Sequence, residues 1–261
     1  MNKIIVNDDL VELQTSSSLN IDVYERQDIF DVTKLKIQVL RSTSLIIEYN
    51  NQGKSKIDIE ININKGVKFK LIEIKEGYEI KVQYKYNLDD YSEILVNKFY
   101  DLDIIKEFDV INLNGKNSTI NYNLNTIAKN KQSIDILVCH NNEKTTSNIN
   151  NKAICILEGS VKFNITCTGY DNIKKYNTNH NNQIINLNDK KCLINPTLLS
   201  DDNIIETNHT EYIGKFNDVD LSYLIKEGIN KENVLKMHIK NFLKLNINNS
   251  KINKIINKYW R

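Results

Sequence analysis

Apolar and polar residues alternate along most of this sequence. The clearest instance is residues 55–63, in which Ile57, Ile59, Ile61 and Ile63 alternate with charged and amide side chains. A spacing of two predicts a strand with one buried face. The same spacing recurs, down to about residue 207, at 67–71, 78–86, 120–124, 134–138, 161–167 and 185–187. The sequence therefore predicts a mainly β fold.

The sequence also indicates how these strands are arranged. No helix of convincing length separates them, so the pattern fits a sandwich or barrel, or a solenoid of stacked short strands. Short strands, β-branched inward faces and closely spaced Asn-rich turns favour the solenoid slightly. One coil cannot bury its apolar face alone, so the coils must stack and their ends must be capped. We expect residues 1–50 to be a mixed N-terminal segment that caps the solenoid, and residues 51–214 to be the β-helix core.

Residues 215–261 change to helical spacing and predict a C-terminal helical subdomain. Asn217 or Asp218 can cap a first helix that stops at Gly228, and Asn230 can cap a second. Ser250 can start a third helix that ends in Tyr259 and Trp260. The subdomain is either an end-cap or a docking surface, because Tyr and Trp are common interface anchors.

Charge and composition exclude several partners. The 35 basic and 33 acidic residues are well mixed and leave a net charge of +2, so nothing draws the chain toward nucleic acid or membrane. The longest apolar runs, Leu45 to Ile47 and Ile154 to Leu157, are too short to span a bilayer. The N-terminus shows no secretory signal, so a cytoplasmic location is expected.

The candidate chemistry is sparse. None of the common nucleotide-binding, hydrolase or metalloprotease motifs occurs, which argues against a self-contained enzyme. Cys192 and His209 could supply soft and borderline ligands to iron or zinc, and Glu211 would share a strand face with His209. Such a pair is nevertheless structural more often than ligating. Cys167 is expected in the core, and His180 in an exposed turn.

Five segments in a fixed order resemble the SufB/SufD proteins of iron–sulfur cluster assembly. The run HNNEKTTSNINNKA from His140 is similar to that family's H-x4-T-x-S-x-I-x2-K-[AG] segment, and the GSVKF that follows resembles its G-x-[IV]-x-[VI] strand. The stretch from Asn188 to Leu198, the HTEYIG from His209 and the DLSYLIKEGI from Asp220 are similar to later segments of the family. The ordered match covers about residues 95–245, which makes it more specific than any single motif.

The resemblance implies a right-handed parallel β-helix flanked by helices. It also implies that an ABC-type ATPase, SufC, docks on the C-terminal helices. The candidate docking residues are Leu221, Tyr223, Leu224, Leu235, Ile239 and Phe242.

This chain departs from the family pattern at the proposed site. SufB-type subunits carry a cysteine in a D-K-C segment and an acidic residue directly after the histidine, whereas SufD-type subunits lack that cysteine. Here Cys192 comes one position late, and Thr210 separates His209 from Glu211. Glu227 stands where the family has Arg.

We therefore expect a cytoplasmic, non-catalytic scaffold on which a nascent iron–sulfur cluster is assembled or transferred, with ATP hydrolysed by a separate SufC-type ATPase. Cys192, His209 and Glu211 are the candidate cluster ligands, supplied at an interface with a second copy or a SufB/SufD paralogue. In a minimal member of the family, two identical copies could replace the SufB–SufD pair. Two alternatives stay open. One is a SufD-like structural partner that binds no cluster, and the other is a solenoid enzyme acting on polysaccharide through charged residues clustered on an exposed face.

Overall fold

The computed structural model describes residues 2–8, 10–24, 32–169, 175–199, 206–243 and 250–259. Its strands are β1 (Asn2–Asn7), β2 (Leu10–Gln14), β3 (Leu19–Tyr24), β4 (Thr33–Val39), β5 (Thr43–Ile63), β6 (Lys68–Leu88), β7 (Glu93–Leu113), β8 (Thr119–Ala128), β9 (Lys131–His140), β10 (Thr145–Cys155), β11 (Ser160–Gly169), β12 (Tyr176–Asn186), β13 (Leu193–Leu199) and β14 (Glu206–Gly214). Its helices are α1 (Asp218–Lys226), α2 (Lys231–Phe242) and α3 (Ser250–Tyr259). Trp260, predicted to end the third helix, lies outside the described residues.

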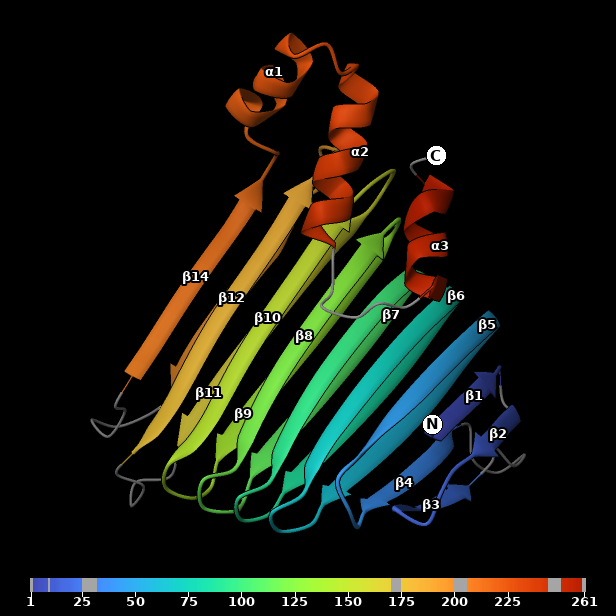
Figure 1. Ribbon diagram of the computed structural model, residues 1–261, viewed down its shortest axis with the longest axis vertical. Coiled ribbons are helices and arrows are strands. Elements are labelled where there is room, and N and C mark those ends of the chain that lie inside the picture. Colours follow the sequence, from blue (N-terminus) through green and yellow to red (C-terminus); the bar gives the residue numbers. More distant parts are fainter. Residues whose placement is uncertain are drawn as a thin grey trace.

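The strands form a solenoid of about six turns. β5, β6 and β7 each run through a whole coil, with the first half in one sheet and the second half in the other. In later coils the halves are separate strands, so β8, β10, β12 and β14 extend the first sheet while β9, β11 and β13 extend the second. In each coil the chain rises in the first sheet and returns behind it, and the coils advance with a right-handed sense (Figure 1). The prediction of a right-handed parallel β-helix with C-terminal helices is confirmed.

The core lies between the two sheets. Alternation sends every second side chain inward, where parallel pairing stacks it on its equivalent in the next coil. Ile57, for example, is in register with Val82, and Ile61 with Tyr86. All four side chains are buried. Stacking in register therefore produces a continuous apolar core, although only every second residue of each strand is apolar.

Asparagines form ladders between coils, so they are not confined to turns. The side-chain amide of Asn87 donates to Asn62 at 2.7 Å, and that of Asn112 donates to Asn87 at 2.9 Å. Asn148 and Asn179 extend a second ladder, each with a hydrogen bond of 2.8 Å. Each amide both donates and accepts, so identical side chains in register satisfy one another.

One turn of each coil repeats a left-handed residue. The equivalent positions are Gly66, Tyr91, Asn117 and Lys144, with φ between 55° and 68°. The backbone N–H of each donates to a carbonyl of the next turn along the solenoid. This bond helps to hold non-glycine residues in a conformation that L-residues disfavour. It explains how the chain makes its turns with few glycines.

The C-terminal helices α2 and α3 pack on the outer face of the first sheet (Figure 1). That face carries isoleucines from successive coils, which form a second apolar cluster with Ile239, Leu243, Ile252, Ile255 and Ile256. The predicted cap at Asn230 is confirmed, because its side chain accepts from the N–H of Asn233 at 2.8 Å. Gly228, with φ 89°, follows the end of α1 as predicted.

The N-terminal segment also consists of strands. β1 pairs with β5 in the first sheet and β4 pairs with β5 in the second, so both belong to the solenoid's sheets. β5 itself runs through residue 50. Across the described ranges, none of the helices is both long and apolar enough to cross a bilayer.

Candidate functional site

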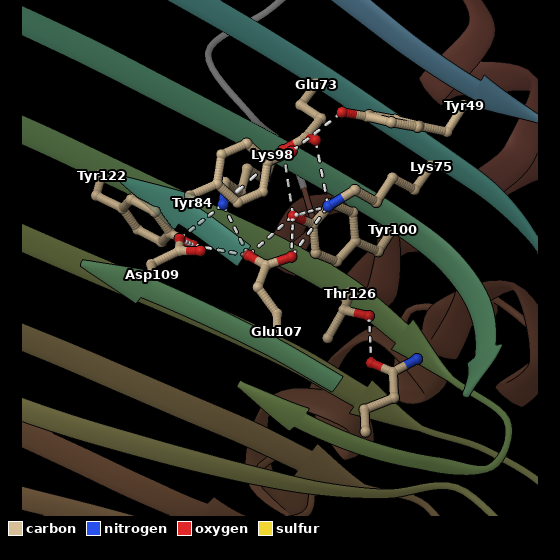
Figure 2. A network of polar contacts seen from close by, with 11 residues as sticks. Tyr49, Glu73, Lys75, Tyr84, Lys98, Tyr100, Glu107, Asp109, Tyr122 and Thr126 are labelled. Atoms are coloured by element: carbon tan, nitrogen blue, oxygen red, sulfur yellow. Dashed lines mark hydrogen bonds and ion pairs between the residues drawn. The ribbon is translucent and has the colours of Figure 1, made fainter. Parts of the chain in front are cut away.

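The middle of the solenoid encloses a network of charged residues (Figure 2). Its five ionisable side chains are fully buried: Glu73, Lys75 and Lys98 from the first sheet, and Glu107 and Asp109 from the second. The Nζ of Lys98 lies 2.7 Å from both Glu107 Oε1 and Asp109 Oδ2. The Nζ of Lys75 lies 3.0 Å from Glu107 Oε2 and 3.2 Å from Glu73 Oε1. These ion pairs join the two sheets across the interior.

Tyrosines surround these charges. The OH of Tyr100 donates to Glu107 at 2.7 Å, and the OH of Tyr122 donates to Asp109 at 2.7 Å. The Nζ of Lys98 lies 3.7 Å from the centre of the Tyr84 ring, within the range of a cation–π contact. The tyrosines thus add hydrogen bonds and ring faces to a site without solvent exposure.

The network is close to charge balance. Burial, together with the neighbouring Glu107, raises the pKa of Asp109 to about 7. Burial alone would also raise the pKa of Glu107, but Lys75 and Lys98 lower it to about 2. A proton held on Asp109 would therefore leave two lysines facing two carboxylates. Because all five groups are enclosed, this cluster offers no charged face to a polysaccharide in solution.

The sequence analysis missed this network, although a signal was present. Glu73 and Lys75 follow Leu71 at a spacing of two, and Lys98 follows Val96 in the same way. Charged residues at the inward positions of an alternating strand predict either a buried ion-pair cluster or a break in the pattern. Only the register between coils shows which residues meet.

The last coil presents the second candidate region. β14 pairs with β12, and among the described residues it has no other neighbour in the sheet. His209 is in register with His180, and the two rings meet edge to face with centroids 4.7 Å apart. Glu211 is in register with the buried Asn182, so it shares the inward face of His209, as predicted. Both His209 and Glu211 are exposed.

The prediction of an exposed turn at His180 is wrong. His180 lies inside β12 with only 2% of its surface exposed, because its inward position is covered by the facing sheet. Its Nε2 lies 3.1 Å from both Cys167 Sγ and Thr178 Oγ1. Burial, and then the nearby His209, lowers the pKa of His180 to about 4.

The polar contacts of His180 continue deeper into the solenoid through Thr178. The hydroxyls of Ser147 and Thr178 lie 3.0 Å apart, and Ser147 Oγ lies 3.1 Å from His140 Nε2. Burial and the charge of His180 lower the pKa of His140 to about 3. The interior of the last coils therefore holds neutral imidazoles, hydroxyls and a thiol, in contrast to the charged middle.

Cys192 lies beside another cysteine. Its Sγ is 3.5 Å from the Sγ of Cys155, with Cys155 fully buried and Cys192 9% exposed. The hydrogen bond from the Cys155 thiol lowers the pKa of Cys192 to about 6, against the opposing effect of burial. The thiolate, which is the form that binds metals, is therefore favoured at Cys192.

The structure does not bring Cys192 next to His209 within one chain. His209 adjoins His180, whose neighbour Cys167 is in register with Leu198 on β13. Leu198 is six residues beyond Cys192. At about 3.3 Å per residue this is roughly 20 Å of extended chain. In the part of the chain that the structure describes, no group of three or more His, Cys, Asp or Glu residues is arranged to hold a metal ion.

The predicted docking residues divide into two groups. Ile239 is fully buried against the first sheet, and Leu235 and Phe242 pack on the same cluster. These three residues attach α2 to the solenoid. Tyr223 on α1 is 63% exposed, whereas Leu221 and Leu224 are partly covered.

The solenoid and its first two helices have a counterpart among known protein families. Residues 37–242 match the family described as SUF system FeS cluster assembly, SufBD core domain. The chain belongs to this family. The SufBD match begins in β4 and ends at the last residue of α2, so it includes both candidate regions. It supports involvement in SUF iron–sulfur cluster assembly. No curated protein matches the chain.

Proposed function

We propose that this SufBD-family chain is a non-catalytic scaffold subunit that receives a nascent iron–sulfur cluster at the end of its solenoid. The cluster is the cargo of the subunit, and a separate ABC-type ATPase supplies the energy. The observation that carries the proposal is the SufBD match across the solenoid and α1–α2. The expected location is the cytoplasm.

The donor atoms of the last coils suit iron. Cys192 offers a soft sulfur, His209 an imidazole and Glu211 a carboxylate, and all three types occur as iron ligands. Clusters usually take four protein ligands, and here Cys192 and His209 lie apart along the coil. The proposal therefore draws the ligands from two subunits that meet at this end.

The outer edge of β14 suits such an interface. Eight of its nine residues are exposed, and its sequence ETNHTEYIG contains neither Pro nor Lys to discourage strand pairing. A second copy or a SufB/SufD paralogue could add its own edge strand across a two-fold axis. Such pairing would double the set of His209 and Glu211 side chains at the interface.

The ATPase would dock on the exposed side of α1 and α2. Tyr223, Ile225 and Met237 are exposed apolar side chains on these helices, whereas the opposite side of α2 is fixed to the sheet. Tyr is a frequent interface anchor. Tyr223→Ala is expected to weaken co-purification with the ATPase and leave the solenoid folded.

Anaerobic reconstitution tests the scaffold role. The chain is purified with its candidate ATPase, incubated with ferrous iron and sulfide, and assayed for mass, iron and sulfide. Cys192→Ala is expected to lower cluster content several-fold, and His209→Ala to lower it as well. Cys139→Ala is the matched control, because Cys139 is half-buried and outside the ligand set.

Two outcomes would change the assignment. Equal cluster loading in wild type and Cys192→Ala would remove Cys192 from the site. Stable co-purification with the ATPase, but without iron in any preparation, would favour the SufD-like role of a structural partner that binds no cluster.

A further inference from the structure

Two cysteines meet at the corner of the solenoid where the chain passes from the first sheet to the second. Cys155 is the last residue of β10, and Cys192 directly precedes β13. Their Sγ atoms are 3.5 Å apart. We propose that Cys155 and Cys192 form a reversible intrachain disulfide.

The two cysteines differ in how firmly the backbone holds them. β10 is paired with β8 on one side and with β12 on the other, and the carbonyl of Cys155 accepts from the N–H of Leu187 at 3.0 Å. Cys192 follows the non-strand residues 187–191 and lies outside the ladder of β13. A disulfide has an S–S distance of about 2.05 Å, so the sulfurs must approach by roughly 1.5 Å. Movement of Cys192 together with these non-strand residues can supply that approach.

Leu187, the first residue of the loop before Cys192, packs against the outer apolar cluster, and the rest of the loop is held by polar contacts near the surface. Asn186 donates to the carbonyl of Lys190 at 2.8 Å, and the Lys190 ammonium pairs with Glu158 at 2.5 Å. Both members of that ion pair are more than half exposed, so the pair adds little rigidity. Residues 188–191 can therefore shift over this short distance while Leu187 stays packed.

The redox step balances with a low-molecular-weight disulfide as oxidant. Cys192, 9% of whose surface is exposed, attacks that disulfide through its sulfur, forms a mixed disulfide and releases one thiol. The Cys155 sulfur then attacks Cys192 Sγ, forms the Cys155–Cys192 bond and releases the second thiol. Two protein thiols lose two electrons and two protons, and the oxidant becomes two thiols.

The other two cysteines provide matched controls within the same fold. Cys167 and Cys139 lie on neighbouring strands, in register with Val138 and Thr168 respectively. Their side chains therefore point to opposite faces of the second sheet. Cys167 is buried beside His180 and Thr178, and no contact joins it to another sulfur among the described hydrogen bonds.

The consequence for cluster assembly rests on the proposed function. If Cys192 is a cluster ligand, the disulfide removes its thiolate from the ligand set, and reduction restores it. Cys155 would then control, through the redox state, whether the end of the solenoid can accept iron.

The test counts thiols on the full-length chain. Wild-type protein is treated with oxidised glutathione, freed of excess reagent, denatured, alkylated and analysed by intact mass and peptide mapping. We expect the number of alkylated cysteines to fall from four to two, with a peptide linking Cys155 to Cys192. Dithiothreitol should restore four. Cys139→Ser and Cys167→Ser should still form the link. In Cys155→Ser, Cys192 should stop at the mixed disulfide with glutathione, because the second thiol is missing.

Persistence of four alkylatable thiols, or a link that involves Cys139 or Cys167, would overturn the proposal. Iron loading is measured separately. A disulfide in the wild type together with undiminished iron in Cys192→Ala would refute the cluster role of Cys192 and leave the disulfide standing. Loss of iron in Cys192→Ala, with no disulfide in the wild type, would refute the disulfide and leave the cluster role of Cys192 standing.

Discussion

The middle of the solenoid and its last coil use the same inward positions in different ways. In the middle, Lys75, Lys98 and three carboxylates are enclosed by coils on both sides and neutralise one another. At the end, His180 is buried while His209, one coil further and in register with it, is exposed. The next coil determines whether an inward polar residue is structural or available. An inward polar residue of the last coil is therefore exposed because of its position in the solenoid, whatever its residue type.

The two regions also respond to pH in opposite directions. The pKa of Asp109 is raised from 3.8 to about 7, so its contribution to stability is complete below pH 4 and is lost as the pH rises through 7. The pKa values of His140 and His180 are lowered from 6.5, so their contribution is complete above that value and is lost on acidification. The following experiments test this contrast.

The largest effect is expected from removing one partner of the enclosed network. Lys98→Met would leave Glu107 and Asp109 without their shared cation, and should lower the free energy of unfolding by about 3–5 kcal/mol. Lys65→Met is the control, because the Lys65–Asp90 pair is exposed and should contribute less than about 1 kcal/mol. Urea unfolding of both variants measures the difference. Equal stabilities would show that the network is not needed for the fold.

The pH dependence of the network should be carried by Asp109. The stability of wild type relative to Asp109→Asn should fall as the pH is raised from about 4 to about 7, with a slope of up to about 1.4 kcal/mol per pH unit, and should level off above pH 7. Asn keeps the shape of the side chain but cannot titrate. Parallel stability curves for the two proteins would contradict the raised pKa of Asp109.

A smaller loss is expected from the buried histidine of the last coils. His180→Ala would remove the ring that contacts Cys167 and Thr178, and should cost about 1–3 kcal/mol. It should also reduce the loss of stability between pH 6.5 and pH 4. Unfolding at pH 5 and pH 7 separates the two effects, and an unchanged acid sensitivity would argue against His180 as its source.

The smallest effect on stability is expected at His209. Its side chain is exposed on an edge strand, so His209→Ala should change the free energy of unfolding by less than about 0.5 kcal/mol. The same variant is expected to lose cluster in the reconstitution assay. A large loss of stability would instead assign His209 a structural role like that of His180.

The sequence by itself determined the mainly β fold and the helical end. Alternation at Ile57–Ile63 and the caps at Asn230 and Gly228 depend on neighbouring residues only, so they can be read locally. The ordered family motifs likewise indicated the SufBD resemblance. The structure confirms these features because hydrophobic periodicity and helix capping each depend on a single segment of sequence.

Only the tertiary structure decided which residues meet. Lys98 and Glu107 belong to opposite sheets, and Cys155 meets Cys192 although 37 positions separate them. Such contacts depend on coil lengths and on the register between coils, in which a shift of one residue would turn every side chain to the other face. The same register separates Cys192 from His209, which the sequence had placed together as candidate ligands. For this reason the fold was predictable from the pattern, whereas the geometry of the site was not.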